Sequence, residues 1–187
     1  MKFSRLLKVD IASKEISLNK TDKLIPEIFL QHPNFTMDTP DNNLMLIKLN
    51  VPLKLKQVSL AVLPDTMDDR EGEKCTVFAW GWSEWNYLTG LEPDIQMNRN
   101  VFFLPNALCQ AIEKSVTIQM TKKMFCAGSN INTISLCKEM SAAPILCQNQ
   151  LYGILSWSKG CALRGDVGYY TKISHYTDWI LNVIRTY

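Results

Sequence analysis

The stretch Cys137-Lys138-Glu139-Met140-Ser141-Ala142-Ala143-Pro144-Ile145-Leu146-Cys147 places one serine between two cysteines. A serine acts as a nucleophile only where a base accepts its proton and backbone N–H groups face the developing oxyanion. Glycines beside such a serine allow positive φ and a close approach to substrate, but alanines occupy positions 142 and 143. Glu139 also adds an anion close to the serine. Ser141 is therefore a candidate nucleophile in surroundings that oppose its use.

Cysteines on either side of this loop belong to a set of six: Cys75, Cys109, Cys126, Cys137, Cys147 and Cys161. No Cys-x-x-Cys pair occurs, and both histidines lie far from the cysteines in sequence, so we expect no metal site. An even number of cysteines suits disulfides in an oxidising compartment. Spacing alone does not choose the pairing.

Composition narrows the class of protein further. The 187 residues suffice for one domain of ordinary size, or for two small barrels that share a core. A net charge of +2 without a basic cluster does not indicate nucleic acid, and no run approaches the ~18 apolar residues of a membrane span. Charges interrupt the apolar part of residues 1–10, so we do not expect these residues to act as a secretory signal peptide.

Short runs of aliphatic and β-branched residues, bounded by turn residues, predict an all-β barrel or sandwich. The runs are residues 44–49, 58–63, 76–80 and 151–157, and the turns are residues 40–42, 63–65 and 158–160. The C-terminus differs, because apolar residues there follow a helical period and predict one stripe of a short amphipathic helix. This stripe consists of Tyr176, Trp179, Ile180, Val183 and Ile184.

The loop around Ser141 resembles the nucleophile loop of trypsin-like serine proteases, which reads Gly-Asp-Ser-Gly-Gly-Pro. Other landmarks of that family follow in the family's order: His32-Pro33-Asn34-Phe35, residues 42–49, Cys75 through Trp80-Gly81-Trp82, Leu108-Cys109-Gln110, residues 124–128, Ser156-Trp157-Ser158 with Gly160-Cys161-Ala162, and residues 168–173. Within the family, the loop is most similar to the trypsin-X-like, probable inactive serine proteases.

This resemblance implies a trypsin-like double β-barrel whose first barrel is incomplete, with a C-terminal α-helix. The whole chain, 1–187, would be one peptidase S1 domain truncated at its N-terminus, with residues 1–70 as the remnant of the first barrel. Residues 71–187 would form the second barrel and the helix. Two explanations for the missing N-terminal part of the domain stay open. The chain is either a truncated product or incomplete gene model, or a true short isoform.

The family's pattern also implies three disulfides, Cys75–Cys147, Cys109–Cys126 and Cys137–Cys161. Together with the cysteine content, the resemblance implies a secreted, extracellular protein. Two N-glycosylation sequons, which begin at Asn19 and Asn34, are relevant only if the chain enters the secretory pathway.

By resemblance, Ser141 holds the nucleophile position and Asn43 the position of the triad carboxylate. The triad histidine would lie on a segment before the first residue seen here, and we expect His32 and His175 to be solvent-exposed residues without a catalytic role. Asp41 would stand roughly 6.6 Å from Asn43 along an extended chain, too far to replace it. Glu139 and Met140 occupy the oxyanion loop, where Met140 cannot pair with the ammonium of a new N-terminus.

The resemblance further places Ser135 at the base of a specificity pocket, with Ser156, Trp157, Ser158 and Gly168 on its walls. A serine at the base favours an apolar slot, although these residues could equally well only pack the second barrel. We therefore expect a monomeric, catalytically inactive homologue without cofactors that binds a protein or peptide ligand, with residues 156–158 as a peptide-binding edge. The alternative is a serine endopeptidase in a fuller-length form.

Overall fold

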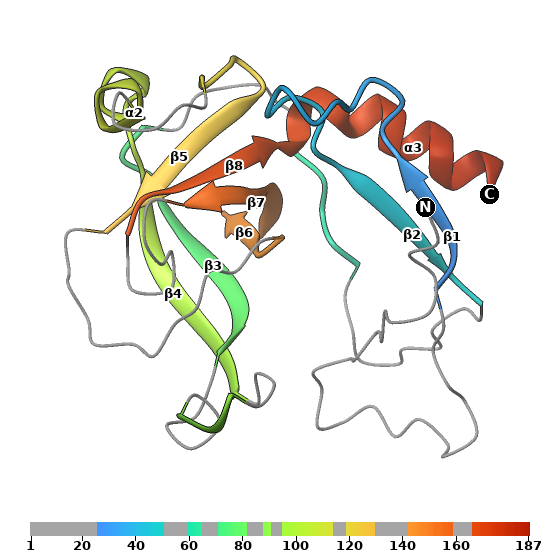
Figure 1. Ribbon diagram of the computed structural model, residues 1–187, viewed down its shortest axis with the longest axis horizontal. Coiled ribbons are helices and arrows are strands. Elements are labelled where there is room, and N and C mark those ends of the chain that lie inside the picture. Colours follow the sequence, from blue (N-terminus) through green and yellow to red (C-terminus); the bar gives the residue numbers. More distant parts are fainter. Residues whose placement is uncertain are drawn as a thin grey trace.

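The computed structural model describes residues 26–50, 60–64, 71–81, 88–90, 95–113, 119–129, 142–158 and 166–187. Within these ranges the chain forms a closed barrel and a separate two-stranded sheet, with a helix at the C-terminus (Figure 1). The predicted all-β architecture with a terminal helix is confirmed. No helix of the described residues is long and apolar enough to cross a membrane.

Six antiparallel strands close the barrel in the order β3-β4-β5-β8-β7-β6. Their bounds are β3 Lys74–Gly81, β4 Ile95–Phe103, β5 Met124–Gly128, β6 Pro144–Cys147, β7 Gln150–Ser158 and β8 Gly168–Lys172. Closure occurs where β3 pairs with β6 over three residue pairs, and one of these pairs is Cys75 with Cys147. A closed barrel leaves no edge strand exposed along its full length.

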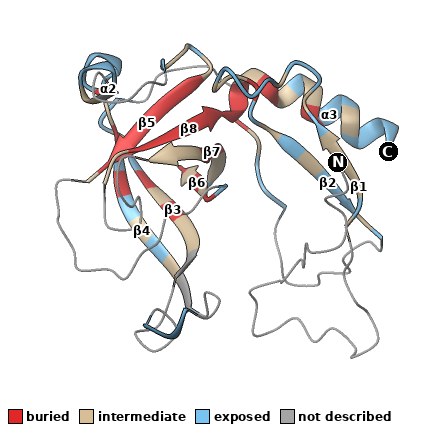
Figure 2. Ribbon diagram, in the orientation of Figure 1, coloured by how far each residue is buried: buried red, intermediate tan, exposed pale blue. Residues whose placement is uncertain are grey.

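Aromatic side chains fill the barrel. The Phe125 ring stacks on Phe103 at 4.7 Å and on Tyr170 at 5.2 Å, and Tyr152 meets it edge-on at 5.3 Å. A Cβ at Gly153 would lie 2.7 Å from the Phe125 ring, so this position must remain glycine for the ring to fit. The buried residues of Figure 2 accordingly concentrate in the barrel, especially in β5 and β8.

The two-stranded sheet consists of β1 (Pro26–Gln31) and β2 (Met45–Leu49). It is joined to the barrel through a second apolar cluster, in which Leu44 and Leu46 pack near the buried Ile173, Tyr176 and Ile180. Ile173 and Tyr176 belong to the 3₁₀ helix η2 (Ile173–Tyr176), and Ile180 belongs to helix α3 (Thr177–Thr186). Helix α3 lies along the sheet in Figure 1. The terminal segment therefore holds the sheet against the barrel.

Two expectations from the sequence need correction. The run 58–63 is described only from Leu60 onward, and there just one residue pairs, because Val62 forms an isolated parallel bridge with Gln150. The helical stripe also ends early: Ile180 is buried, but Ile184 is 63% exposed. Helix α3 extends past the cluster that it covers, so its last turn faces solvent.

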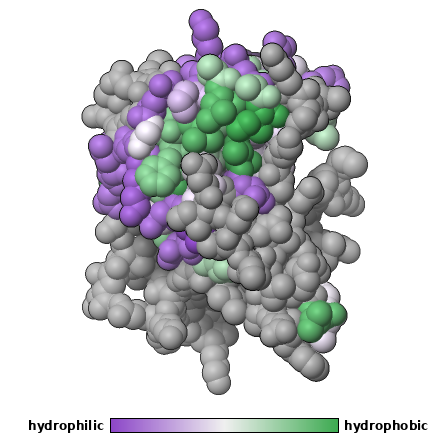
Figure 3. All heavy atoms as spheres, turned by 90° about the vertical axis from the view of Figure 1, so that its left-hand side faces the viewer, coloured by the Kyte–Doolittle hydropathy of each residue, from purple (hydrophilic) through white to green (hydrophobic). Residues whose placement is uncertain are grey.

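Helix α2 (Asn106–Glu113) lies on the outside of the barrel. Its Cys109 is fully buried against Met124 and Tyr169, whereas Leu108 is 45% exposed. Figure 3, which views the side that carries α2, shows apolar side chains gathered in one patch with hydrophilic residues around part of it. The helix is thus fixed by the side that carries Cys109.

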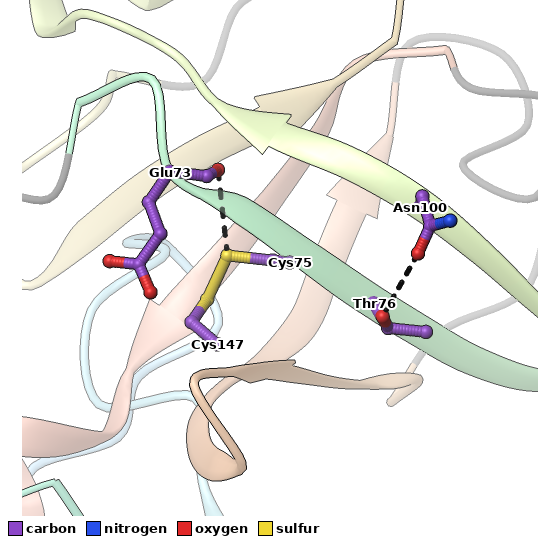
Figure 4. The surroundings of a disulfide bond; sticks show 5 residues. All are labelled: Glu73, Cys75, Thr76, Asn100 and Cys147. Atoms are coloured by element: carbon purple, nitrogen blue, oxygen red, sulfur yellow. Dashed lines mark hydrogen bonds between the residues drawn. A yellow bond between two sulfur atoms is a disulfide. The ribbon is translucent and has the colours of Figure 1, made fainter.

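Both disulfides within the described residues follow the pattern that the resemblance implies. Cys75 is bonded to Cys147 and Cys109 to Cys126. Figure 4 shows the first of these between β3 and β6, close to the backbone of Glu73. The third expected pair, Cys137–Cys161, lies outside the described residues.

Candidate functional site

Asn43, at the expected triad-acid position, lies where the small sheet meets the barrel. Its side-chain amide donates a hydrogen bond to Ser156 Oγ on β7 at 3.0 Å. Its backbone carbonyl accepts one from Thr171 Oγ1 on β8 at 3.2 Å. Contacts to two neighbouring barrel strands therefore fix Asn43, whose side chain remains exposed to solvent.

The neighbouring Asn42 determines this placement. It is 8% exposed and has a φ of 58°, a left-handed conformation that asparagine tolerates better than most residues. Its backbone N–H donates to Tyr176 Oη at 3.0 Å, and Lys123 Nζ donates to its Oδ1 at 3.0 Å. The side-chain amide of Asn42 donates to the Asn34 carbonyl oxygen at 3.0 Å. Every polar group of the Asn42 side chain thus has a partner, as burial demands.

Sequence reasoning did not single out Asn42, Lys123 or Tyr176 for this role. The turn signal Pro40-Asp41-Asn42 was the one local indication, since asparagine is common in turns that need positive φ. The partners Lys123 and Tyr176 come from distant parts of the chain, and no local pattern announces them.

Asp41 has a hydrogen-bond partner other than Asn43. Its carboxylate accepts a hydrogen bond from the Thr121 hydroxyl, ahead of β5. The extended geometry that we assumed for residues 41–43 is wrong, because residues 41 and 42 form a turn. The conclusion drawn from that geometry is unchanged, since Asp41 has a partner of its own elsewhere.

Ser156 occupies an irregular position in β7. The register of β7 against β8 shifts between Leu155 and Trp157, which is the sign of a β-bulge at Ser156. Bulges redirect a side chain and are frequent beside active sites. Here the irregularity coincides with the side chain that meets Asn43.

The expected pocket walls lie side by side across β7 and β8. Trp157 is paired with Tyr169, on whose ring it stacks at 3.7 Å, and Ser158 is paired with Gly168. A Cβ at Gly168 would lie 2.9 Å from both Leu155 Cδ1 and Tyr170 Oη. Gly168 therefore has close neighbours where a side chain would project. Ser135, the expected base, lies outside the described residues.

Both histidines are half-buried, so the expectation of solvent-exposed residues is wrong. The His32 ring lies 5.3 Å from the Tyr176 ring and 4.9 Å from the Trp179 ring, and its Nδ1 accepts a hydrogen bond from the Asn34 N–H. Burial, and then the nearby Lys123 ammonium, lower the pKa of His32. Burial is also the first cause that lowers the pKa of His175. The ring of His32 is thus engaged in aromatic packing.

The described chain resumes directly after Ser141. Ala142 donates its N–H to the Leu155 carbonyl oxygen at 2.8 Å, and the Leu155 N–H donates to the Ala143 carbonyl oxygen at 2.8 Å. Ser141 itself, with Glu139 and Met140, lies outside the described residues. These two hydrogen bonds fix the end of the loop beside Leu155, one residue before the partner of Asn43.

Ala142 has a φ of 62°, where a Cβ is strained. Left-handed backbone costs an L-residue roughly 1–2 kcal/mol, and glycine avoids most of this cost. We expect Ala142→Gly to raise the free energy of unfolding by about 1 kcal/mol. Urea denaturation would measure the change.

Ala143→Gly is the matched control, because Ala143 is buried and is not among the described residues with positive φ. That variant should lower the stability by roughly 0.5–1 kcal/mol. Equal losses in both variants would contradict the strain at Ala142.

The sequence profile of the trypsin family matches residues 7–180, nearly the whole chain. This chain belongs to the trypsin family. Serine protease 58 of Homo sapiens is 38% identical over 161 residues, which are 85% of this chain and 64% of that relative. Probable inactive serine protease 58 of Bos taurus is 36% identical, with the same two shares. Trypsin-3 of Salmo salar is 33% identical over 96% of this chain and 74% of its own length.

This trypsin-family chain thus spans 64% of the length of the first two relatives. Within the described residues, Asn43 and Ser156, two positions that the family resemblance assigns to the active-site region, meet through a hydrogen bond. Among the described residues, no group of three or more His, Cys, Asp or Glu side chains could hold a metal ion.

Proposed function

We propose that this trypsin-family chain is catalytically inactive and acts by binding an extended peptide or protein segment. The observation that carries the proposal is the hydrogen bond from the Asn43 amide to Ser156 Oγ. By the family resemblance, this neutral amide stands where the family mechanism uses a carboxylate.

A carboxylate in this position performs two tasks that an amide cannot. It holds the catalytic histidine in the correct tautomer, and its charge stabilises the imidazolium that forms during reaction. A carboxylate-to-amide change alone lowers the turnover of such a triad by about 10⁴-fold. The sequence adds Glu139 and Met140 beside the serine, which further oppose the binding of an oxyanion.

The binding part of the proposal rests on residues 156–158 of β7. The ladder between β6 and β7 ends at Ile154, so among the described strands only β8 pairs with this segment. A strand edge of this kind can add an extended peptide through main-chain hydrogen bonds. The neighbouring stack of Trp157 on Tyr169 offers an apolar contact beside it.

A pair of matched peptides tests this mode of binding. An extended apolar peptide should bind saturably, followed by calorimetry or tryptophan fluorescence. N-methylation of its backbone removes N–H donors while the protein stays unchanged, and should weaken binding at least about tenfold, or roughly 1.4 kcal/mol. Equal affinity for both peptides, or no saturable binding by either, would reject strand addition.

The alternative function is serine endopeptidase activity in a fuller-length form. Two observations favour it: Ser141 is present in the sequence, and several relatives are named trypsin. The test is to supply the upstream part of the domain and measure amide hydrolysis. A rate above that of a Ser141→Ala control would support the endopeptidase.

We also infer that the protein is secreted. Two disulfides among the described residues suit an oxidising compartment, where such bridges persist. Non-reducing peptide mapping of protein from the medium of expressing cells would test this inference. Free thiols at Cys75 and Cys109 would oppose it.

A further inference from the structure

The connection between β1 and β2 carries the sequon Asn34-Phe35-Thr36, the one of the two sequons that lies within the described residues. Such a triplet is an acceptor for N-linked oligosaccharide, provided that its asparagine remains at the surface after folding. Glycosylation therefore requires that the Asn34 side chain is not engaged in contacts within the folded chain.

The backbone of Asn34 is held by two hydrogen bonds. Its N–H donates to His32 Nδ1 at 3.2 Å, and its carbonyl oxygen accepts from Asn42 Nδ2 at 3.0 Å. The side chain is exposed and has no hydrogen-bond partner within the described residues. The hydrogen bonds of Asn34 in the fold thus involve its main-chain atoms, and a sugar on Nδ2 would leave these bonds intact.

The surroundings of Asn34 leave room for a large polar group. Pro33, Thr36 and Met37 are all exposed, and Met37 is 90% exposed. Phe35 is only half-exposed, and the Phe35 N–H donates to the His32 carbonyl oxygen at 3.0 Å, which closes the turn. A hydrogen-bonded turn therefore carries Asn34, whose side chain is exposed at the surface.

We propose that Asn34 is N-glycosylated. In this transfer, the oligosaccharide comes from a lipid-diphosphate-linked donor in the secretory pathway. The bond between its first sugar carbon and the diphosphate breaks, and that carbon forms a bond to Asn34 Nδ2. One amide proton leaves Nδ2 for a base of the transferase, and the lipid diphosphate departs with the electron pair.

The proposal rests on the secretory route inferred above, so the experiment supplies that route. The full chain is expressed behind a cleavable secretory leader in mammalian cells, and lysate and medium are both treated with peptide N-glycosidase. We expect the glycosidase to increase the electrophoretic mobility of the protein. In Asn34→Gln and in Thr36→Ala, this increase should be smaller by the contribution of one glycan. Thr36→Ser keeps the sequon and should retain the shift.

The variant Asn19→Gln removes the other sequon, so that any remaining mobility shift is due to Asn34. The glycosidase converts a glycosylated asparagine to aspartate, so mass spectrometry of residue 34 gives a second readout that does not depend on folding of the variants. Aspartate at position 34 after treatment supports the proposal. Unmodified asparagine there, in chains from which the leader has been cleaved, overturns it. Neither readout involves peptide binding, so failure here is distinct from failure of the proposed function.

Discussion

Replacing Cys75 and Cys147 together by alanine is expected to lower the free energy of unfolding by about 4 kcal/mol. The bridge spans 72 residues and constrains the unfolded chain accordingly. It also lies where the barrel closes, since β3 and β6 pair at three positions, of which Cys75 and Cys147 form one. Ordinary domains have 5–15 kcal/mol of stability in total, so this loss should remove a large share of the stability.

Chemical denaturation of the oxidised protein and of the double variant would measure the effect. The matched control is the double replacement of Cys109 and Cys126, whose bridge spans only 17 residues. The chain-entropy relation gives about 3 kcal/mol for that shorter loop. A barrel that keeps its full stability without the Cys75–Cys147 bridge would contradict the role given to it in closure.

The second large effect concerns catalysis. The refolded chain should hydrolyse amide substrates no faster than its Ser141→Ala variant, at least ~10⁴-fold below trypsin measured in parallel. The reason is that the Asn43 amide gives no negative charge beside Ser156, where a triad requires a carboxylate. Steady-state assays with chromogenic amides and esters would measure the rates.

Asn43→Asp provides the companion variant. An aspartate can accept a hydrogen bond from the Ser156 hydroxyl, so the contact that fixes position 43 should survive. We still expect hydrolysis at the Ser141→Ala level, because Glu139 and Met140 remain in the nucleophile loop. A rise in turnover specific to Asn43→Asp would contradict the predicted inactivity of the nucleophile loop.

Much of the barrel could be predicted from the sequence because its signals are local. The runs at 44–49, 76–80 and 151–157 became β2, β3 and β7, and the apolar period at the C-terminus became α3. The pairing of Cys75 with Cys147 could not come from spacing, and it needed the family resemblance. That resemblance also led to Asn43, whose contact with Ser156 joins residues 113 positions apart.

The remaining features depend on contacts that local patterns do not encode. The Asn42 N–H finds its acceptor, Tyr176 Oη, 134 residues away, and this contact fixes the turn that the extended-chain argument missed. His32 was expected in solvent because the family resemblance assigns it to a surface segment, His32-Pro33-Asn34-Phe35. Its ring is half-buried because Tyr176 and Trp179 of the distant C-terminal segment pack on it.

The most direct test of catalytic inactivity is labelling by a fluorophosphonate probe, which reacts with serines activated as nucleophiles. The oxidised chain, its Ser141→Ala variant and active trypsin are incubated with the probe, and the modified residue is located by mass spectrometry. We predict labelling of trypsin and no labelling of this chain above the Ser141→Ala background. Covalent modification of Ser141, absent from the Ser141→Ala variant, would contradict the account.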